Sequence, residues 1–452
     1  MPSDKGISRR RIVKGVIASG AAGLAGCLGD DDSGGNGSDG GNGGETEGVE
    51  FTAWSFGPNF PVLEEGAEHW NEQNPDTAVP EEISDDAREW TSALQVQEGL
   101  PGIGLLHYPI MRSAARNGGL ENVNDIVKPN VDQLIDSAIS ATHVDGNFFA
   151  IPHSINPVVI VYNRSMFEDA GLPGNPDDLE GEVETYEDLV GAGEQMQAEI
   201  GADLLAHGSQ NIRPPNALMT QFGGGFYNPD GEFQFDQPSN VDVFQTLKDL
   251  QPYGANLDLF GNVIWDEFKN GNVASFLIPG WYLGFITDNL EEMSGEWRIA
   301  RLPEPNSGGP RGATAGGAPE AIPVAKDDGI KEPAKEFGEF RNMSETSYNQ
   351  KLRNYIFPAN IVEDPEVYDE SVEYFGDQQI FEPIGNTLEA SPPQDSAPNN
   401  EIEQMYQEAY RQIMDEDADI DETLSSTHED MMEVLPEEDQ TRMTVEEVRN
   451  SA

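Results

Sequence analysis

The sequence predicts an α/β protein whose 452 residues are divided between two domains or lobes. Three observations lead to this prediction. A chain of this length exceeds what one ordinary hydrophobic core accommodates. Hydrophobic residues make up 37% of it and include twenty Phe, twelve Tyr and six Trp, which is enough for globular folding. Beyond residue 48, β-rich runs alternate with segments of helical periodicity, a pattern typical of helices layered on mostly parallel sheets.

The first elements after residue 48 each have a local reason. Residues 49–54 alternate and are rich in β-forming side chains, so we expect a strand there. A helix follows from Pro61, which is tolerated in a first turn, and ends at Asn74, which precedes a proline. The apolar residues 103–106 predict a buried strand. The next helix ends near Gly118, because glycine readily adopts the left-handed cap conformation.

Later elements follow the same logic. The Asp-Gly turn at 145–146 separates two short strands, and the five apolar residues 158–162 predict another strand. Near the C-terminus, apolar residues at helical spacing predict a helix over 402–413 and a second one over 424–435. We expect the residues after Pro436 to fray.

The charge of the chain excludes several classes of function. Lys and Arg number 25 against 83 Asp and Glu, which gives a formal net charge of −58. Nucleic acid and anionic lipid surfaces repel such a chain. The single cysteine and the scattered histidines offer no disulfide and no metal-binding pattern, so we predict neither metal nor cofactor. Because the acids are spread along the whole sequence, we interpret them as a halophilic surface that stays hydrated in concentrated salt.

The first fifty residues predict export and anchoring. We interpret residues 1–26 as a twin-arginine lipoprotein signal peptide, because paired arginines precede an apolar run, Val16–Ala25, that is too short to span a bilayer. The Leu-Ala-Gly-Cys sequence that ends at Cys27 resembles a lipobox, so we expect this cysteine to carry a lipid. Residues 27–49 then form a flexible, acidic, Gly-rich tether. The predicted location is the extracellular face of the cell membrane.

Short sequence blocks with a characteristic order and spacing span about residues 50 to 360. They lie at 117–123, 145–152, 161–167, 170–172, 185–189, 268–274, 280–281, 301–303, 316–317 and 321–323. These blocks resemble those of family 1 extracellular solute-binding proteins, the maltose/sugar-type receptors of ABC importers. One block departs from the family, since Gly102 stands where the family has Asp after Pro101.

The resemblance implies a type II periplasmic-binding-protein-like fold, with two α/β lobes, an interlobe hinge and a ligand cleft. It places lobe 1 at 50–153 plus 304–342 and lobe 2 at 154–303 plus 343–452. It implies capture of a sugar or oligosaccharide and delivery to the membrane subunits of an ABC permease. We expect a monomer that carries out no catalysis.

Ligands of open α/β sheets bind beyond the carboxyl ends of the strands, so residues just after each strand are the candidate ligand contacts. Together with the resemblance, this rule selects Trp54, Phe56, His107, Tyr108, Asn156, Phe222, Gly224, Tyr227, Trp281, Tyr282, Gly317 and Glu320. Trp281 resembles the stacking tryptophan of the family. Core packing remains the alternative for Trp54, and a solvated surface acid is the alternative for Glu320.

Three other functions remain open from the sequence. A receptor of the same fold could bind a polyamine or another small solute, which an acidic cleft would suit. An exported enzyme could act on surface polysaccharide, although 83 acids make carboxylate pairs uninformative and no G-x-S-x-G motif occurs. A structural surface protein would bind no ligand. We predict no catalytic residue.

Overall fold

The computed structural model describes residues 48–452, except 85, 209–212, 325–327, 363–364 and 394–395. The predicted signal peptide, the lipidation of Cys27 and nearly all of the tether lie outside the described residues. Everything reported below belongs to one compact unit, Glu47–Ala452.

A mixed sheet runs through both lobes. In the described chain it contains ten strands, and the main path has the order β2-β1-β3-β11-β6-β9-β7-β8, with β10 and β12 also paired to β6. The strands are β1 (Glu50–Ser55), β2 (Thr77–Glu82), β3 (Ile103–Leu105), β6 (Ile151–Asn163), β7 (Asp203–His207), β8 (Gly254–Asn256), β9 (Val273–Pro279), β10 (Trp297–Ala300), β11 (Thr314–Ala321) and β12 (Phe357–Pro358). A separate hairpin joins β4 (His143–Val144) to β5 (Asn147–Phe148).

The sheet is less parallel than we expected. Strand β1 is parallel to β2 and β3, and β7 is parallel to β8 and β9. The middle strands β6 and β11 pair antiparallel with each other and with their neighbours. Within each lobe, strands joined through helices therefore pair in parallel. The strands that cross between the lobes run in opposite directions and pair antiparallel.

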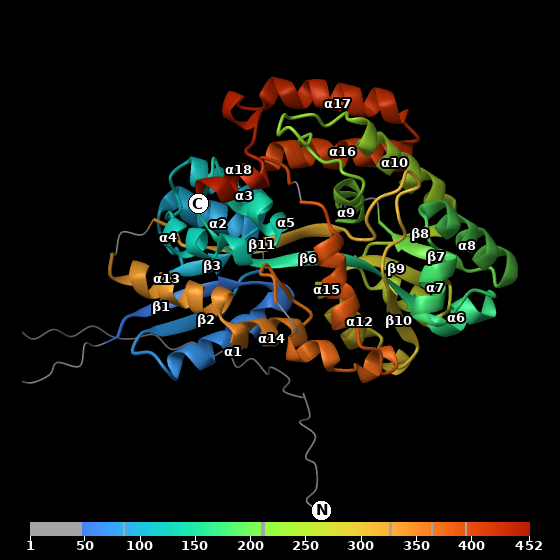
Figure 1. Ribbon diagram of the computed structural model, residues 1–452, viewed down its shortest axis with the longest axis horizontal. Helices are drawn as coiled ribbons and strands as arrows, with labels where there is room; N and C mark the ends of the chain where they lie inside the picture. The colour runs from blue at the N-terminus through green and yellow to red at the C-terminus, as the bar shows by residue number, and fades with distance from the viewer. Residues whose placement is uncertain (1–47, 85, 209–212, 325–327, 363–364, 394–395) are drawn as a thin grey trace, which may run out of the picture. The chain divides into compact units, whose positions relative to one another are not determined.

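Lobe 1 is built on β1, β2 and β3 (Figure 1). Its helices are α1 (Phe60–Asn71), α2 (Asp86–Val96), α3 (Tyr108–Arg116), α4 (Asn124–Val127), α5 (Asp136–Thr142), α13 (Asp328–Met343) and α18 (Val445–Ser451). The apolar faces of these helices form two buried clusters, one around Phe51 and Phe337 and one around Trp54 and Trp90. The strands and helices predicted between residues 49 and 118 are confirmed.

Lobe 2 is built on β7, β8 and β9, and its helices pack on both faces of the sheet (Figure 1). They are α6 (Arg164–Asp169), α7 (Pro176–Glu182), α8 (Tyr186–Glu199), α9 (Arg213–Gln221), α10 (Pro238–Leu250), α11 (Val263–Lys269), α12 (Leu283–Asn289), α15 (Phe381–Ala390), α16 (Asn400–Glu416) and α17 (Ile420–Val434). Helix α14 (Glu345–Arg353) contacts α1 and α13 of lobe 1 and also β12, so it lies at the hinge. The two helices predicted between 402 and 435 are confirmed as α16 and α17.

Two expectations about lobe boundaries differ from the structure. Arg311 donates hydrogen bonds to the backbone oxygens of Leu302 and Val183, so the chain before β11 stays with lobe 2 beyond residue 304. The C-terminal residues do not fray. They form α18, whose Val448 is buried in the core of lobe 1 rather than lobe 2. A capping box of Thr444 and Glu447 begins this helix.

Candidate ligand-binding cleft

A cavity of about 440 Å³ lies where both lobes meet the middle strands. Its lining residues are Phe56, Gly57, Pro58, Asn59, Glu82, Ile83, Ser84, His107, Ser154, Asn156, Phe260, Trp281, Phe285, Gly317 and Ala318. The lobe 1 residues follow the carboxyl ends of β1, β2 and β3, and Trp281 follows β9. This position agrees with the rule that ligands of α/β sheets bind beyond the strand ends.

The wall from lobe 1 carries one aromatic pair and several polar groups. The rings of Phe56 and His107 stack with centroids 5.1 Å apart and an interplanar angle of 30°. Asn59, Glu82 and Ser84 lie around this pair. Glu82 and His107 are the only titratable side chains among the described lining residues, which include neither Lys nor Arg.

The wall from lobe 2 carries a second aromatic group. The rings of Phe260 and Trp281 are parallel within 5°, with centroids 6.1 Å apart. Phe285 lies nearly perpendicular to both rings, 5.9 Å from Trp281 and 6.5 Å from Phe260. Phe260 is 59% exposed, which is unusual for a large aromatic side chain and marks it as a surface available to a ligand.

The floor of the cleft is formed by the two strands that cross between the lobes. Ser154 and Asn156 come from β6, and Gly317 and Ala318 come from β11. A Cβ atom on Gly317 would lie 2.1 Å from the backbone oxygen of Ser154, so the close approach of the two strands requires glycine. Asn156 donates a long hydrogen bond, 3.5 Å, to the backbone oxygen of Ala315.

Beneath the floor lies a buried ionic cluster. Glu320 is 1% exposed and is paired with Arg341, and it accepts a 2.7 Å hydrogen bond from Asn342. Lys351 donates to the backbone oxygen of His153 at 3.0 Å and to Asn342 Oδ1 at 2.8 Å. Burial lowers the pKa of Lys351 to about 7, although Glu320 acts in the opposite direction. The cluster joins β6 and β11 to the junction between α13 and α14.

The structure brings five of the predicted residues together. Phe56, His107, Asn156, Trp281 and Gly317 line the cleft. They come from both lobes and from the crossing strands, as a site that depends on lobe closure requires.

Four other predicted residues are buried outside the lining. Trp54 packs edge-on against Trp90, with centroids 5.5 Å apart, and it donates to Glu81. Tyr108 and Tyr282 donate to the backbone oxygens of Ser154 and Leu259, respectively. Glu320 belongs to the ionic cluster. These side chains support the walls and the floor from behind, because hydrogen bonds hold them in the core.

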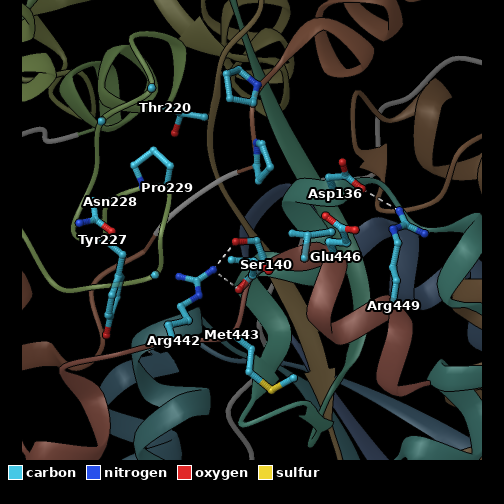
Figure 2. A pocket seen from close by; sticks show the side chains of 17 residues that line it. Asp136, Ser140, Thr220, Tyr227, Asn228, Pro229, Arg442, Met443, Glu446 and Arg449 are labelled. Atoms are coloured by element: carbon cyan, nitrogen blue, oxygen red, sulfur yellow. Dashed lines mark hydrogen bonds and ion pairs between the residues drawn. The ribbon is translucent and has the colours of Figure 1, made fainter.

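The remaining predicted residues lie elsewhere. Gly224 and Tyr227 line a second, larger cavity of about 530 Å³, which Figure 2 shows. Phe222 packs against Tyr186, with ring centroids 5.7 Å apart. These residues belong to the glycine-rich segment 221–227, which begins where α9 ends.

Several lining residues were not predicted from the sequence. Phe260 and Phe285 carry no sequence signal that separates them from core phenylalanines. Asn59 lies a few residues after β1, whereas Glu82 ends β2 and Ser84 follows it. The rule that placed Phe56 in the cleft finds them only once β2 is recognised as a strand.

The described residues contain no group of three or more His, Cys, Asp or Glu arranged to hold a metal ion. Among them, too, no helix combines the length and the apolar character needed to cross a membrane.

Two lobes, crossing strands and an interlobe cleft define the class of two-lobed solute-binding folds. The chain belongs to the family of bacterial extracellular solute-binding proteins, which matches residues 53–340. This finding confirms the resemblance inferred from the sequence blocks.

Individual relatives agree with this assignment. The chain is 28% identical over 358 residues to the arabinooligosaccharide-binding protein of Halalkalibacterium halodurans, which covers 75% of this chain and 78% of the relative. Among solved structures, the sugar-binding protein MalE of Xanthomonas citri superposes with a TM-score of 0.70 at 16% identity and covers 86% of this chain and 97% of that one. A binding protein from B. animalis subsp. lactis in complex with β-1,6-galactobiose gives a TM-score of 0.68 at 17% identity, covering 85% and 97%. These structures confirm the two-lobed α/β fold.

Proposed function

We propose that this protein captures a neutral oligosaccharide in the interlobe cleft and delivers it to an ABC import permease. The observation that carries the proposal is the pair of aromatic surfaces, Phe56 with His107 and Phe260 with Trp281, that flank one cavity from opposite lobes. Aromatic faces pack against the C–H groups of sugar rings, while nearby amides and hydroxyls hydrogen-bond to sugar hydroxyls. A volume of about 440 Å³ falls within the range of small-molecule sites.

The charge of the lining favours a neutral ligand. Phosphorylated or acidic sugars need cationic partners, and the described lining residues include no Lys or Arg. A polyamine would need several carboxylates, whereas Glu82 is the only one present among those residues. Most retaining and inverting glycosidases use a pair of carboxyl groups, so this lining also supports capture rather than hydrolysis. The relative in Halalkalibacterium halodurans makes arabinooligosaccharides the first ligands to test.

Binding and lobe closure are coupled in this proposal. A sugar that touches both walls gains its full set of contacts only when the lobes approach each other. Its higher affinity for the closed form therefore shifts the population toward that form, which the permease would recognise.

The proposed location and environment rest on the sequence. We propose twin-arginine export, lipid attachment at Cys27 and a monomer tethered to the outer face of the membrane in a salt-rich habitat. Mass spectrometry of the cell-purified protein would test the lipid, and an N-terminus that still carries residues 1–26 would contradict it.

Calorimetry with arabinotriose in concentrated salt tests the function. We expect saturable binding by the native protein, no change in the sugar recovered afterwards, and a strong loss of affinity in Trp281→Ala. Phe222→Ala is the matched control, because it removes a partly buried aromatic ring of lobe 2 outside the cleft. Equal losses in the two variants, or shortened sugar products, would contradict the proposal.

A further inference from the structure

The chain crosses between the lobes once more near its C-terminus. Helix α17 packs against α16 and α10 in lobe 2, whereas α18 packs against α5 in lobe 1 (Figure 1). We call the connecting residues, 436–444, the C-terminal strap. The strap is distinct from the crossings by β6, β11 and the α13–α14 junction.

Residues 439–442 of the strap are fixed to lobe 2. Gln440 accepts a 2.9 Å backbone hydrogen bond from Phe233, and the backbone nitrogen of Arg442 donates to the oxygen of Gly231 at 2.8 Å. The hydroxyl of Tyr227 donates to the backbone oxygen of Asp439 at 2.8 Å. The strap therefore pairs antiparallel, like a short strand, with residues 231–233 of lobe 2.

The same residues are also held by lobe 1. Arg116 of α3 forms a 2.5 Å ion pair with Asp439. The Arg442 guanidinium donates to the backbone oxygen of Ser140 in α5 at 2.5 Å and also to its hydroxyl, as the dashed lines in Figure 2 show. Arg449 then fixes α18 through a 2.7 Å ion pair with Asp136.

The strap lies on the side of the crossing strands opposite the ligand cleft. Successive side chains of a strand point to opposite faces. Ser154 and Asn156 face the cleft, whereas Ile155 between them packs in one cluster with Ala138 of α5. Because α5 also supplies Ser140, the Arg442 contact and the 530 Å³ cavity lie behind the hinge.

When the two lobes rotate about the crossing strands to close the cleft, their surfaces on the opposite side, where the strap lies, move apart. Arg442 is the last strap residue bonded to lobe 2, and Thr444 begins α18 on lobe 1. Two residues of extended chain span at most about 7 Å. A rear gap that widens on closure must therefore stretch this connection or break its contacts.

We infer that the C-terminal strap opposes lobe closure and so sets the ligand affinity of a cleft that it does not touch. The effect on affinity rests on the proposed function, but the effect on the ligand-free lobes does not. Residues such as Arg442 and Arg116 act here as positioning residues.

The test measures the distance between the lobes in the full chain with Cys27→Ser. Spin labels at Glu64→Cys on α1 and Asp266→Cys on α11, both exposed, report this distance. In Arg442→Ala we expect a shorter mean distance without ligand. With arabinotriose as the probe, we expect binding at least about fivefold tighter.

Two further variants make the result decisive. Arg411→Ala is the control, because this arginine pairs with Glu408 and Glu416 within α16 and holds no lobe 1 residue. If Arg442→Ala does not fold, Tyr227→Phe removes only the hydroxyl that holds Asp439 and should shift the distance in the same direction. An unchanged or longer distance in the folded strap variants would overturn the inference, even if no tested sugar binds. A shorter distance between the lobes in the strap variants, with no binding of any tested sugar, would support the inference about the strap and refute only the proposed ligand.

Discussion

Phe260→Ala is the sharpest test of ligand binding in the cleft, because this side chain contributes little to the stability of the fold. Phe260 is 59% exposed. Substitutions at such positions usually change stability by no more than about 0.5 kcal/mol. The melting temperature should therefore stay close to that of the native protein, apart from a small loss of packing against Trp281.

The expected loss of affinity follows from the exposed area. An aromatic side chain presents about 200 Å², so ~120 Å² of Phe260 faces solvent. A sugar ring that covers one face would remove ~60 Å² from water, worth ~1.5 kcal/mol at about 25 cal/mol per Å². This loss of binding free energy corresponds to a roughly tenfold larger dissociation constant.

Titration calorimetry with a series of arabinooligosaccharides measures this loss. Phe260 stacks against Trp281 and adds a second aromatic ring to the lobe 2 wall, so a longer oligosaccharide should lose more affinity than a disaccharide. Unchanged affinity for every chain length, or a fall in affinity that merely follows a lower melting temperature, would refute this role of Phe260.

The remaining predictions concern the hinge and the surface. The folded-state pKa of Lys351, about 7, lies below its ordinary value of 10.5, so between these values the unfolded chain holds one proton more and stability rises with pH. Lys351→Met should lower stability throughout but flatten this rise, and urea unfolding at pH 7, 8 and 9 would contradict the reasoning if both proteins gave the same slope. With 83 acids against 25 basic residues, removal of salt should unfold the chain. Circular dichroism during dialysis measures this, and a cooperative fold in dilute buffer would count against a halophilic surface.

The sequence could predict the parts of the cleft that depend on local rules. Phe56, His107 and Trp281 directly follow strands whose apolar character is evident in the sequence, and strand ends meet at one edge of a sheet. The same rule cannot separate Trp281 from Tyr282, its neighbour. Tyr282 is the more buried of the two because its hydroxyl donates a hydrogen bond to the backbone oxygen of Leu259, which belongs to a different segment of the chain.

Long-range contacts explain the other differences. Glu320 is buried because Arg341 and Asn342, on the next helix, form an ion pair and a hydrogen bond with its carboxylate. No local sequence pattern predicts these contacts. The final helix is different, since the Thr444–Glu447 capping box is visible in the sequence and could have predicted it. Its place at the end of the chain, where residues often fray, led to the opposite expectation.

Several basic side chains hold the hinge and the C-terminal strap, and their burial decides how they respond to salt. Arg341 and Lys351 are buried within the hinge cluster, where mobile ions screen little. Arg116 and Arg449, which hold the C-terminal strap and α18, have side chains 26% and 27% exposed. Since the Debye length is about 3 Å at molar salt, their ion pairs should weaken while the hinge cluster persists. Salt would then relax the strap without loosening the hinge, so sugar affinity should rise with salt in the native protein but not in Arg116→Ala, which lacks the ion pair between the strap and lobe 1.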